Sequence, residues 1–390
     1  MTNSSITSST VTNTTSSKVQ CLEKGLICCL RSSKKCYFNY FWLRDNCPTS
    51  FDSTTQERSF DLSSLKEAPK PKSAEIIDDN LHILWQNETH RSVFALEFLR
   101  EYSDGQARND IALVSKIHWF KDYYDSMQRF DHNQLIQNPT LVQKWAECLL
   151  IYGVSIVTNM PKSKTGLLKT ASLLGHVRSS FFGETFEVKI HPSPVNLAYT
   201  ANALEMHTDL PAEELAPGIQ YLHCLENSVE GGNSLFLDGA AVAEDFRSSN
   251  PKDFALLSQI AIPFFCKHDD FDMRARQKVI ELGQGGEVTG LTISGHLKDI
   301  FDHDQSLLDQ YYPALWRFGH FLNDDKYLMK FRLNAGECIV FDNHRIVHGR
   351  ESYESGMGAR HLRGCYTDMG ELRSTYRSLH TKHSQSNQQQ

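Results

Sequence analysis

The order of apolar and polar residues predicts two β-rich regions, one in each half of the chain. Between residues 18 and 104, short apolar and β-branched runs such as VQCL, GLICCL, CYFNYFWL, LHILW and SVFAL are separated by turn-forming residues. From residue 195 onward the pattern returns in VNLAYT, GIQYLHCL, NSLFLDG, GECIVFDN, RIVHGR and HLRGCYTD. Short runs of this composition, bounded by turn formers, are typical of strands.

Helical periodicity marks other segments. Within residues 139–152, apolar side chains recur with the period of a helix at Leu141, Trp145, Cys148, Leu149 and Tyr152. Further helices are predicted over residues 96–101, 167–174, 238–246 and 251–260. Many strands without a regular strand–helix alternation favour a mainly β fold with added helices, a sandwich or barrel, over a doubly wound sheet.

Both ends of the chain are polar. Residues 1–17 are almost entirely Ser, Thr and Asn and carry no charged side chain, so they cannot bury enough surface to order. A mitochondrial presequence would carry arginines, and the first arginine here is Arg31. We therefore expect a disordered tail over 1–17, a small β-rich N-terminal domain over 18–104, a larger domain over 105–380 and a polar tail over 381–390.

Composition and charge exclude several classes of function. The 390 residues include 40 Lys and Arg against 47 Asp and Glu, and the net charge of −7 supplies no broad attraction to nucleic acid or anionic membrane. The longest apolar stretch, residues 254–266, is too short to span a bilayer. Ten cysteines without a signal peptide indicate free thiols in a reducing compartment, so we expect a cytoplasmic protein.

Candidate metal ligands occur in two segments. In the run MHTD, His207 and Asp209 are two residues apart, so on an extended chain they project to the same side. His348 follows 141 positions after His207, on an apolar strand pattern. Two imidazoles and one carboxylate occupy one face of an octahedron and leave the other face open, which is the facial triad of non-haem iron(II) oxygenases. The His-x-Asp pattern alone would also suit a core histidine beside a turn aspartate.

A candidate anion site lies close to the second histidine. Arg360 comes twelve residues after His348, in a strand-like run whose alternation puts Arg363 on the opposite face. A guanidinium on the inner face could hold a carboxylate through two hydrogen bonds. Ser234, in the run GGNS, offers a hydroxyl and a close backbone approach to the same anion.

Several longer segments together resemble one enzyme family. They are FWLRDNCP, NLAYT, MHTDLP, PGIQYLHCL, GGNSLFLDG, FDNHRIVHGRESYESG and RHLRGCYTD, in family order between residues 18 and 380. The chain resembles the gamma-butyrobetaine hydroxylase and trimethyllysine dioxygenase branch of the Fe(II)/2-oxoglutarate-dependent oxygenases, the wider group that includes taurine dioxygenase. KVIEL and RESYESG bring it nearer to the hydroxylase. The resemblance implies a double-stranded β-helix, or jelly-roll, core in residues 105–380, and a homodimer.

The resemblance also implies roles for matching positions. The positions that match the family's iron ligands are His207, Asp209 and His348. Those that match its 2-oxoglutarate contacts are Arg360, Asn196, Ser234 and Leu222. Those that match its aromatic cage for a trimethylammonium group are Phe182, Phe186, Tyr199 and Tyr366. A quaternary ammonium has no N–H to donate, so aromatic faces and dispersion select it. The spacing of Phe182 and Phe186 would also suit a buried helix edge.

The N-terminal domain departs from the family pattern. The family carries a structural zinc there on three cysteines and one histidine. Here Cys47 and His90 remain, while Thr49 and Asp52 stand at the next two thiol positions. Because two ligands do not close a tetrahedral structural site, we predict that structural zinc is absent.

The substrate end of the site departs as well. The residue after HTD, usually tyrosine in the hydroxylase, is Leu210 here. The segment 290–301, which usually supplies asparagines and an arginine, keeps Ser294 and His296 as its polar groups near those positions. The cage end of the substrate site is therefore retained, whereas the groups that would hold the substrate's anionic end are changed.

The sequence thus predicts a dioxygenase that uses Fe(II), 2-oxoglutarate and O2 to hydroxylate a small quaternary amine zwitterion. The substrate predicted first is gamma-butyrobetaine, which would give carnitine, and a trimethylammonium phosphonate or trimethyllysine is the alternative. A metal-binding jelly roll without turnover is disfavoured by the intact triad with Arg360. A zinc hydrolase is disfavoured because no general base accompanies the ligands. No nucleic acid or membrane partner is expected.

Overall fold

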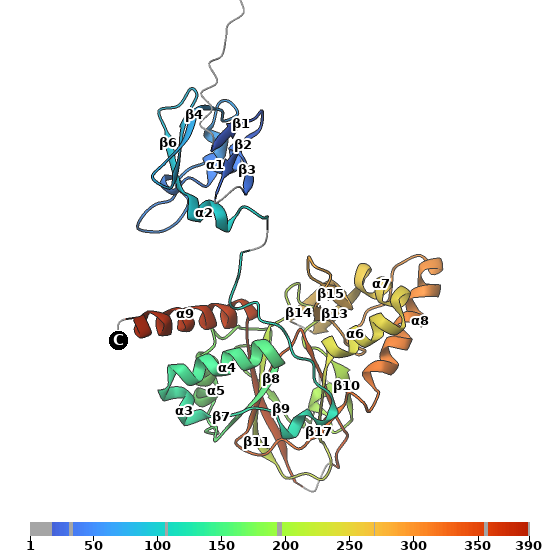
Figure 1. Cartoon of the computed structure of the whole chain (residues 1–390). Coiled ribbons are helices and arrows are strands. Elements are labelled where there is room, and N and C mark those ends of the chain that lie inside the picture. The colour runs from blue at the N-terminus through green and yellow to red at the C-terminus, as the bar shows by residue number, and fades with distance from the viewer. Residues whose placement is uncertain are drawn as a thin grey trace, which may run out of the picture. The chain divides into compact units, whose positions relative to one another are not determined.

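The computed structural model describes residues 18–388 apart from 31–33, 106–107, 193–196, 269 and 355–357. The expected tail over 1–17 lies outside the described residues. Contacts within the chain separate two compact units, one up to Asp110 and one from Ile111 onward (Figure 1). Each unit is described by itself.

The N-terminal unit contains two antiparallel three-stranded sheets and two short helices. One sheet orders β1 (Val19–Cys21), β2 (Gly25–Cys29) and β3 (Lys35–Asn39), and the other orders β4 (Pro71–Ile77), β5 (Asn80–Trp85) and β6 (Arg91–Ala95). The helices are α1 (Tyr40–Asp45) and α2 (Leu96–Glu101). Leu26, Leu43, Leu81 and Phe94 from these elements share one buried cluster, so the two sheets and α1 enclose a single core.

The prediction of one extended run for CYFNYFWL is wrong in its second half. Strand β3 ends at Asn39, and α1 begins at Tyr40. The Asn39 side chain accepts hydrogen bonds from the backbone N–H groups of Phe41 and Trp42 at 2.8 and 3.3 Å. This N-cap satisfies helix donors that a strand would pair elsewhere, and it stops the strand inside an apolar run.

The C-terminal unit is built around two facing sheets. The larger sheet orders β7 (Arg129–Asp131), β8 (Val154–Thr158), β18 (Cys338–Asp342), β11 (Ile219–Asn227), β20 (Arg360–Thr367) and β9 (Phe186–Val188). The smaller one orders β10 (Leu204–His207), β19 (Ile346–Arg350), β12 (Ser234–Asp238) and β17 (Met329–Phe331). Phe236 of the smaller sheet and Leu222 and Ile339 of the larger one belong to the same buried cluster, so the sheets pack face to face. From β17 to β20 the chain alternates between the two sheets.

Helices cover the outer face of the larger sheet. They are α3 (His132–Gln137), α4 (Pro139–Tyr152), α5 (Lys164–Ala171) and α9 (Met369–Gln388). Trp145 of α4, Leu167 of α5 and Leu372 of α9 share a buried cluster with Tyr221 and Val340 of the sheet. Figure 1 shows α4 and α9 running side by side along this face.

A second group of elements packs against the smaller sheet. It contains α6 (Gly239–Ser249), α7 (Pro251–Gln259), α8 (Gln305–Leu322) and the hairpins β13 (Ala261–His268) with β14 (Phe271–Lys278) and β15 (Ile280–Leu282) with β16 (Val288–Leu291). Phe246, Leu257 and Phe318 from its three helices are buried together with Val347 of β19. This side of the unit therefore has its own apolar core on the outer face of the smaller sheet.

The predicted helices are present, and two differences are informative. Helices α2 and α4 have the predicted bounds, and α5, α6 and α7 begin and end within a few residues of theirs. The described part of VNLAYT is a 3-10 turn, Leu197–Tyr199, and not a strand. Residues 381–388, expected in a polar tail, continue α9, because His383 hydrogen-bonds Thr140 and Gln143 of α4 and so holds the last turns of α9 against it.

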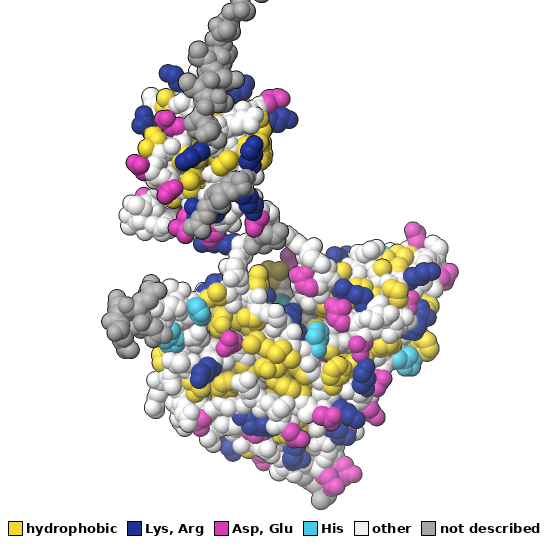
Figure 2. Space-filling model, in the orientation of Figure 1, with side chains coloured by type: hydrophobic (Ala, Val, Ile, Leu, Met, Phe, Trp, Pro, Cys, Tyr) yellow, Lys and Arg dark blue, Asp and Glu magenta, His cyan; other side chains and the backbone are white. Residues whose placement is uncertain are grey.

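Two further observations concern the charged side chains on the surface and the apolarity of the helices. Basic and acidic side chains are interspersed over the face of the molecule that Figure 2 shows. In the described part of the chain, no helix is both long enough and apolar enough to cross a membrane.

Candidate metal centre

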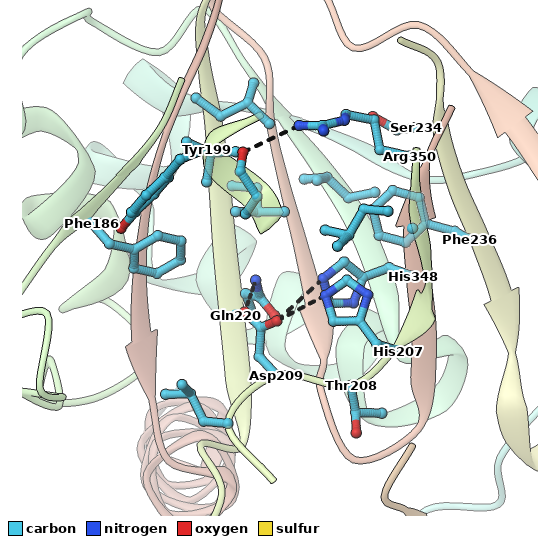
Figure 3. A pocket seen from close by; sticks show the side chains of 18 of the residues that line it. Phe186, Tyr199, His207, Thr208, Asp209, Gln220, Ser234, Phe236, His348 and Arg350 are labelled. Carbon is cyan, nitrogen blue, oxygen red and sulfur yellow. Dashed lines mark hydrogen bonds and ion pairs between the residues drawn. The ribbon is translucent and has the colours of Figure 1, made fainter. Parts of the chain in front are cut away.

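Two histidines and an aspartate meet where the smaller sheet faces the larger one. His207 ends β10 and is the cross-strand partner of His348 in β19, and their ring centroids are 4.3 Å apart. Asp209 follows as the chain leaves β10. One ligand atom from each of the three residues lies within 4.8 Å of the others, and they form the one such group found among the described residues. Figure 3 shows both rings turned toward the carboxylate.

The turn that places Asp209 is held through its backbone. Asp209 N–H donates to Oδ1 of Asn343 at 2.7 Å, and Asn343 Nδ2 donates to the Asp209 carbonyl oxygen at 3.1 Å. The next residue, Leu210, has a φ of 57°, in the left-handed region that a leucine adopts only when its surroundings hold it there. The buried Asn343 amide supplies that constraint.

The protonation of the three side chains fits a metal cation. His207 Nδ1 donates to the carbonyl oxygen of Glu205 at 2.7 Å, so Nε2 is the ring nitrogen left to face a metal, and this atom lies 3.2 Å from Asp209 Oδ1. His348 Nε2 lies 3.6 Å from the same oxygen. Burial and the neighbouring His207 lower the pKa of His348 to about 3, so its ring is neutral. Two imidazole nitrogens and a carboxylate oxygen thus converge on one point, and nitrogen and oxygen donors suit iron(II).

The pKa of Asp209 is lowered as well. Burial opposes ionisation of this carboxyl, but the neighbouring His207 and His348 and the hydrogen bond from the Tyr366 hydroxyl outweigh burial. The group is therefore a carboxylate at neutral pH, as a metal ligand must be.

Aromatic rings form one wall of the pocket that contains this group. Phe186 of β9 stacks on Tyr366 of β20 with centroids 5.0 Å apart, and Phe182 lies 5.9 Å from Phe186. Phe182 precedes β9 in a turn, so the pair does not lie on a helix edge, but both rings do pack on one buried cluster. Tyr199 lines the same pocket from its 3-10 turn. The structure thus brings the four predicted cage residues together.

Gly364 explains why Phe186 occupies its place. It is the cross-strand partner of Phe186 in β20, and a Cβ at Gly364 would lie 2.1 Å from Cζ of the Phe186 ring. Only a residue without a side chain leaves room for the ring against the strand. The aromatic wall therefore depends on this glycine.

The predicted anion-binding residues lie on another side of the pocket. Arg360, Ser234 and Leu222 all line it, while Asn196 lies outside the described residues. Figure 3 shows Ser234 across the pocket from Phe186. Arg363 is bonded instead to Glu187 Oε1 at 2.7 Å and does not line the pocket.

Arg360 is a buried cation that lacks a counter-ion among the described residues. Its Nε donates to the carbonyl oxygen of Gly232 at 3.3 Å, and no described carboxylate pairs with it. Burial and the neighbouring Arg350 lower the pKa of Arg360 to about 10, so it remains charged at neutral pH. An unpaired buried guanidinium is costly, so this residue fits an anionic ligand.

Arg350 was not among the predicted site residues, although it stands two positions after His348. Its NH2 group donates to the carbonyl oxygens of Thr200 and Asn202 at 2.8 and 2.5 Å, and its NH1 group donates to that of Ala198. These carbonyls flank Tyr199, so Arg350 ties the turn that carries this ring to the metal-ligand strand. Arg350 lies beside Ser234 in Figure 3.

The polar residues expected near the substrate are divided between two cavities. His296 lines the pocket and lies edge-on to His207, with ring centroids 5.3 Å apart. Burial and the neighbouring His207 lower the pKa of His296 to about 4, so it is neutral. Ser294 lines a separate cavity beside α8, and its hydroxyl lies 3.4 Å from His296 Nδ1.

Asp209 has two further contacts that the sequence did not indicate. Gln220 Nε2 donates to its Oδ2 at 2.6 Å, and the Tyr366 hydroxyl donates to the same oxygen at 2.7 Å. Gln220 could have been noticed in the sequence as a glutamine that shares the inward-facing side of its strand with apolar residues.

In the N-terminal unit, the residues left at the family's zinc positions have other surroundings. Cys47 Sγ lies 3.2 Å from the Thr49 hydroxyl, and His90 Nε2 is buried with no hydrogen-bond partner in the described part of the chain. The absence of structural zinc stays a prediction.

Comparison with known proteins places the chain in a family. Residues 122–366 match the Taurine catabolism dioxygenase TauD, TfdA family, so the protein belongs to this family and is a dioxygenase. It is 33% identical to gamma-butyrobetaine dioxygenase of Pseudomonas sp. (strain AK-1) over 342 residues, covering 86% of this chain and 89% of that one. Identity to the human gamma-butyrobetaine dioxygenase is 30%, over 87% and 90% of the two chains. Human mitochondrial trimethyllysine dioxygenase is 27% identical over 88% of this chain and 82% of its own.

Proposed function

We propose that this dioxygenase uses Fe(II), 2-oxoglutarate and O2 to hydroxylate a trimethylammonium zwitterion, with gamma-butyrobetaine as the first substrate. The observation that carries the proposal is one pocket that combines the His-Asp-His group, an unpaired buried guanidinium and a wall of aromatic rings. The likeness to gamma-butyrobetaine dioxygenases supports this choice. Trimethyllysine or a trimethylammonium phosphonate is the alternative substrate.

In this proposal each part of the pocket has one task. His207, Asp209 and His348 hold iron, which supplies the oxidising chemistry that turns a substrate C–H into C–OH as 2-oxoglutarate becomes succinate and CO2. Arg360 and the Ser234 hydroxyl hold the distal carboxylate of 2-oxoglutarate, with Leu222 against its carbon chain, and Asn196 is assigned to the same co-substrate. Fixing one C–H bond beside the metal and limiting the access of water to it would be the protein's main contribution.

The cage wall sets the substrate class. The pocket is lined by four aromatic residues, Phe182, Phe186, Tyr199 and Tyr366. In this proposal a methylated cation binds against these rings, which it can do without a hydrogen-bond acceptor. The same faces cannot satisfy the N–H groups of a primary ammonium. The residues near the expected position of the substrate's anionic group, Leu210 and the neutral His296, favour no single acidic group. The proposal therefore includes alternative substrates with different acidic groups.

A substrate panel tests this function. The purified protein with Fe(II), 2-oxoglutarate and O2 is given gamma-butyrobetaine, trimethyllysine, a trimethylammonium phosphonate, taurine and 4-aminobutyrate, and succinate release and product mass are measured. A desolvated cation–π contact contributes roughly 2 kcal/mol and unsatisfied N–H groups cost about 1–3 kcal/mol. We therefore expect gamma-butyrobetaine to exceed 4-aminobutyrate at least about a hundredfold in kcat/KM. Equal turnover of these two compounds would contradict the cage, and no succinate with any of the amines would contradict the function.

We further infer that the two facing sheets of the C-terminal unit form the double-stranded β-helix, or jelly roll. The alternation of strands between the sheets supports this inference. We also propose that the N-terminal β-rich part is a domain of its own, that the protein is a cytoplasmic homodimer, and that it has no nucleic acid or membrane partner. Light scattering of the purified protein would test the dimer.

A further inference from the structure

The two oxygens of the Asp209 carboxylate have different surroundings. Oδ1 faces His207 Nε2 at 3.2 Å and His348 Nε2 at 3.6 Å. Oδ2 accepts hydrogen bonds from Gln220 and Tyr366 at 2.6 and 2.7 Å. One oxygen is thus left for a metal, and the other is fully engaged by the protein. Figure 3 shows the Gln220 amide against the carboxylate, on the side away from the two rings.

We propose that Gln220 and Tyr366 are positioning residues that hold Asp209 as a one-oxygen metal ligand. A carboxylate can bind a metal through one oxygen or, after a small rotation, through both. Rotation of Asp209 would break two short hydrogen bonds to a charged acceptor, which are among the stronger hydrogen bonds in proteins. The pair therefore prevents the second oxygen from taking a coordination position that the co-substrates need. This inference rests on the proposed iron site.

The strand register accounts for the arrangement. Gln220 of β11 and Tyr366 of β20 are direct cross-strand partners, so their side chains leave the larger sheet side by side on the same face. Asp209 approaches that face from the end of β10, in the opposite sheet. The two donors consequently belong to one sheet, whereas the metal-facing imidazoles belong to the other. The carboxylate is held between them.

The Gln220 amide is costly to retain, which points to a role beyond packing. The residue is 1% exposed, and its Oε1 is buried without a hydrogen-bond partner among the described residues. A flipped amide would set Oε1 against the carboxylate oxygen, so the donor orientation follows from the contact. An apolar side chain of similar size would avoid the half-satisfied amide. An apolar side chain, however, could not donate the hydrogen bond to Asp209.

Tyr366 performs two tasks in this arrangement. Its ring stacks on Phe186 in the aromatic wall, while its hydroxyl holds Asp209. A change at Tyr366 that removes the ring would affect both tasks. Gln220 takes no part in the wall, so it gives the cleaner test, and Tyr366→Phe keeps the ring while removing the hydroxyl.

The test measures binding of Mn²⁺ alone to the full-length apoprotein, without substrate or 2-oxoglutarate, by titration calorimetry. Gln220→Met and Tyr366→Phe each remove one donor to Oδ2 with little change in volume. The matched control is Tyr221→Phe on the same strand, which removes a buried hydroxyl whose partner, at 3.3 Å, is Thr367 on the opposite face. Visible absorption spectra of the Co²⁺-loaded proteins report how the carboxylate binds, which a change in packing elsewhere would not alter.

We expect Gln220→Met and Tyr366→Phe to weaken Mn²⁺ binding by about 10- to 100-fold, as losses of such supporting hydrogen bonds do. Both should change the Co²⁺ spectrum, and Tyr221→Phe should leave the affinity and the spectrum at parental values. Parental affinity and spectrum in both variants would overturn the proposal, as would an equal loss in Tyr221→Phe. If circular dichroism shows that Gln220→Met is unfolded, Tyr366→Phe decides. Failure of the parent itself to bind Mn²⁺ would instead remove the proposed iron site.

Discussion

At the scale of single residues, the pocket contains a buried cation, Arg360, that does not stabilise the fold. Arg360 is 6% exposed and makes one long hydrogen bond, to the Gly232 carbonyl oxygen at 3.3 Å. A buried cation without a counter-ion destabilises a folded protein. A bound dicarboxylate would supply the missing partner, so part of the binding free energy of the co-substrate comes from relieving this burial.

Arg360→Ala should therefore raise the KM for 2-oxoglutarate far more than the KM for the amine. Losing one partner of a buried, hydrogen-bonded charge pair costs about 2–5 kcal/mol, which corresponds to at least roughly a thirtyfold increase in KM. Succinate release at varied 2-oxoglutarate and fixed amine measures the effect. Because the affected ligand is the co-substrate, raising its concentration should restore much of the rate.

Arg363→Ala is the matched control for this prediction. Arg363 is three residues further along the same strand, but its guanidinium is bonded to Glu187 and does not line the pocket. We expect the KM for 2-oxoglutarate to stay near the parental value. If Arg363→Ala gave the large increase and Arg360→Ala did not, the strand would present the opposite face to the pocket.

Sequence reasoning found the site residues whose chemistry is visible in a short motif. His207 and Asp209 form such a motif, and Arg360 stands out as a cation on an apolar strand face. Gln220, Asn343 and Arg350 were not assigned roles. Their partners lie 11, 134 and about 150 positions away in the sequence, and only the pairing of strands shows which atoms meet.

At the scale of elements, the β9–β20 pair determines where the aromatic wall stands. Gly364→Ala would add a methyl group within 2.1 Å of the Phe186 ring, which must then move. We expect the KM for the preferred amine to rise at least about tenfold, since a displaced ring loses roughly 1.4 kcal/mol or more of contact. Calorimetric Mn²⁺ affinity should change much less than this KM, because Phe186 stacks on the ring of Tyr366, whereas Asp209 is held by the Tyr366 hydroxyl.

Gly370→Ala is the control for this prediction. Gly370 lies in α9, and a Cβ there would meet no atom within 4 Å. The variant should keep the parental KM and gain slightly in stability from the helix propensity of alanine. An unaltered KM in Gly364→Ala would mean that the ring at 186 does not contact the substrate.

Helices were predictable where the helical period of apolar residues continues without a break from the N-cap to the C-cap. Helix α4 has an apolar face throughout, Asn138 before its first residue and Gly153 after its last, and its bounds were predicted correctly. Helix α8 was missed, because Pro313 lies inside it and interrupts the pattern. Helix α1 was predicted as a strand, because its apolar residues continue the run of β3 without a break.

At the scale of the whole molecule, a buried histidine ties stability to pH. His223 of β11 is fully buried, and both ring nitrogens lack partners among the described residues. Burial, and secondarily the charge of Arg363, lower its pKa to about 4. The unfolded chain therefore takes up a proton near pH 6.5 that the folded chain refuses until about pH 4.

The sign of the effect follows. Between these two values the unfolded state binds more protons, so the free energy of unfolding rises with pH and falls on acidification. His223→Leu should remove up to about 3 kcal/mol of this pH dependence. Urea unfolding of both proteins from pH 4 to pH 7 measures the difference between the two curves. Parallel curves would show that His223 is protonated equally in the folded and unfolded states.

The pairing of β10 with β19 has a consequence for biosynthesis. His207 and His348 face each other across two strands but are 141 positions apart in the chain. At about 5–20 residues per second, a ribosome makes the second histidine roughly 7 to 28 seconds after the first. A chain that ends before residue 348 thus has at most two of the three ligands, which do not complete the facial site. Loading with metal therefore distinguishes chains that include β19 from chains that end before it.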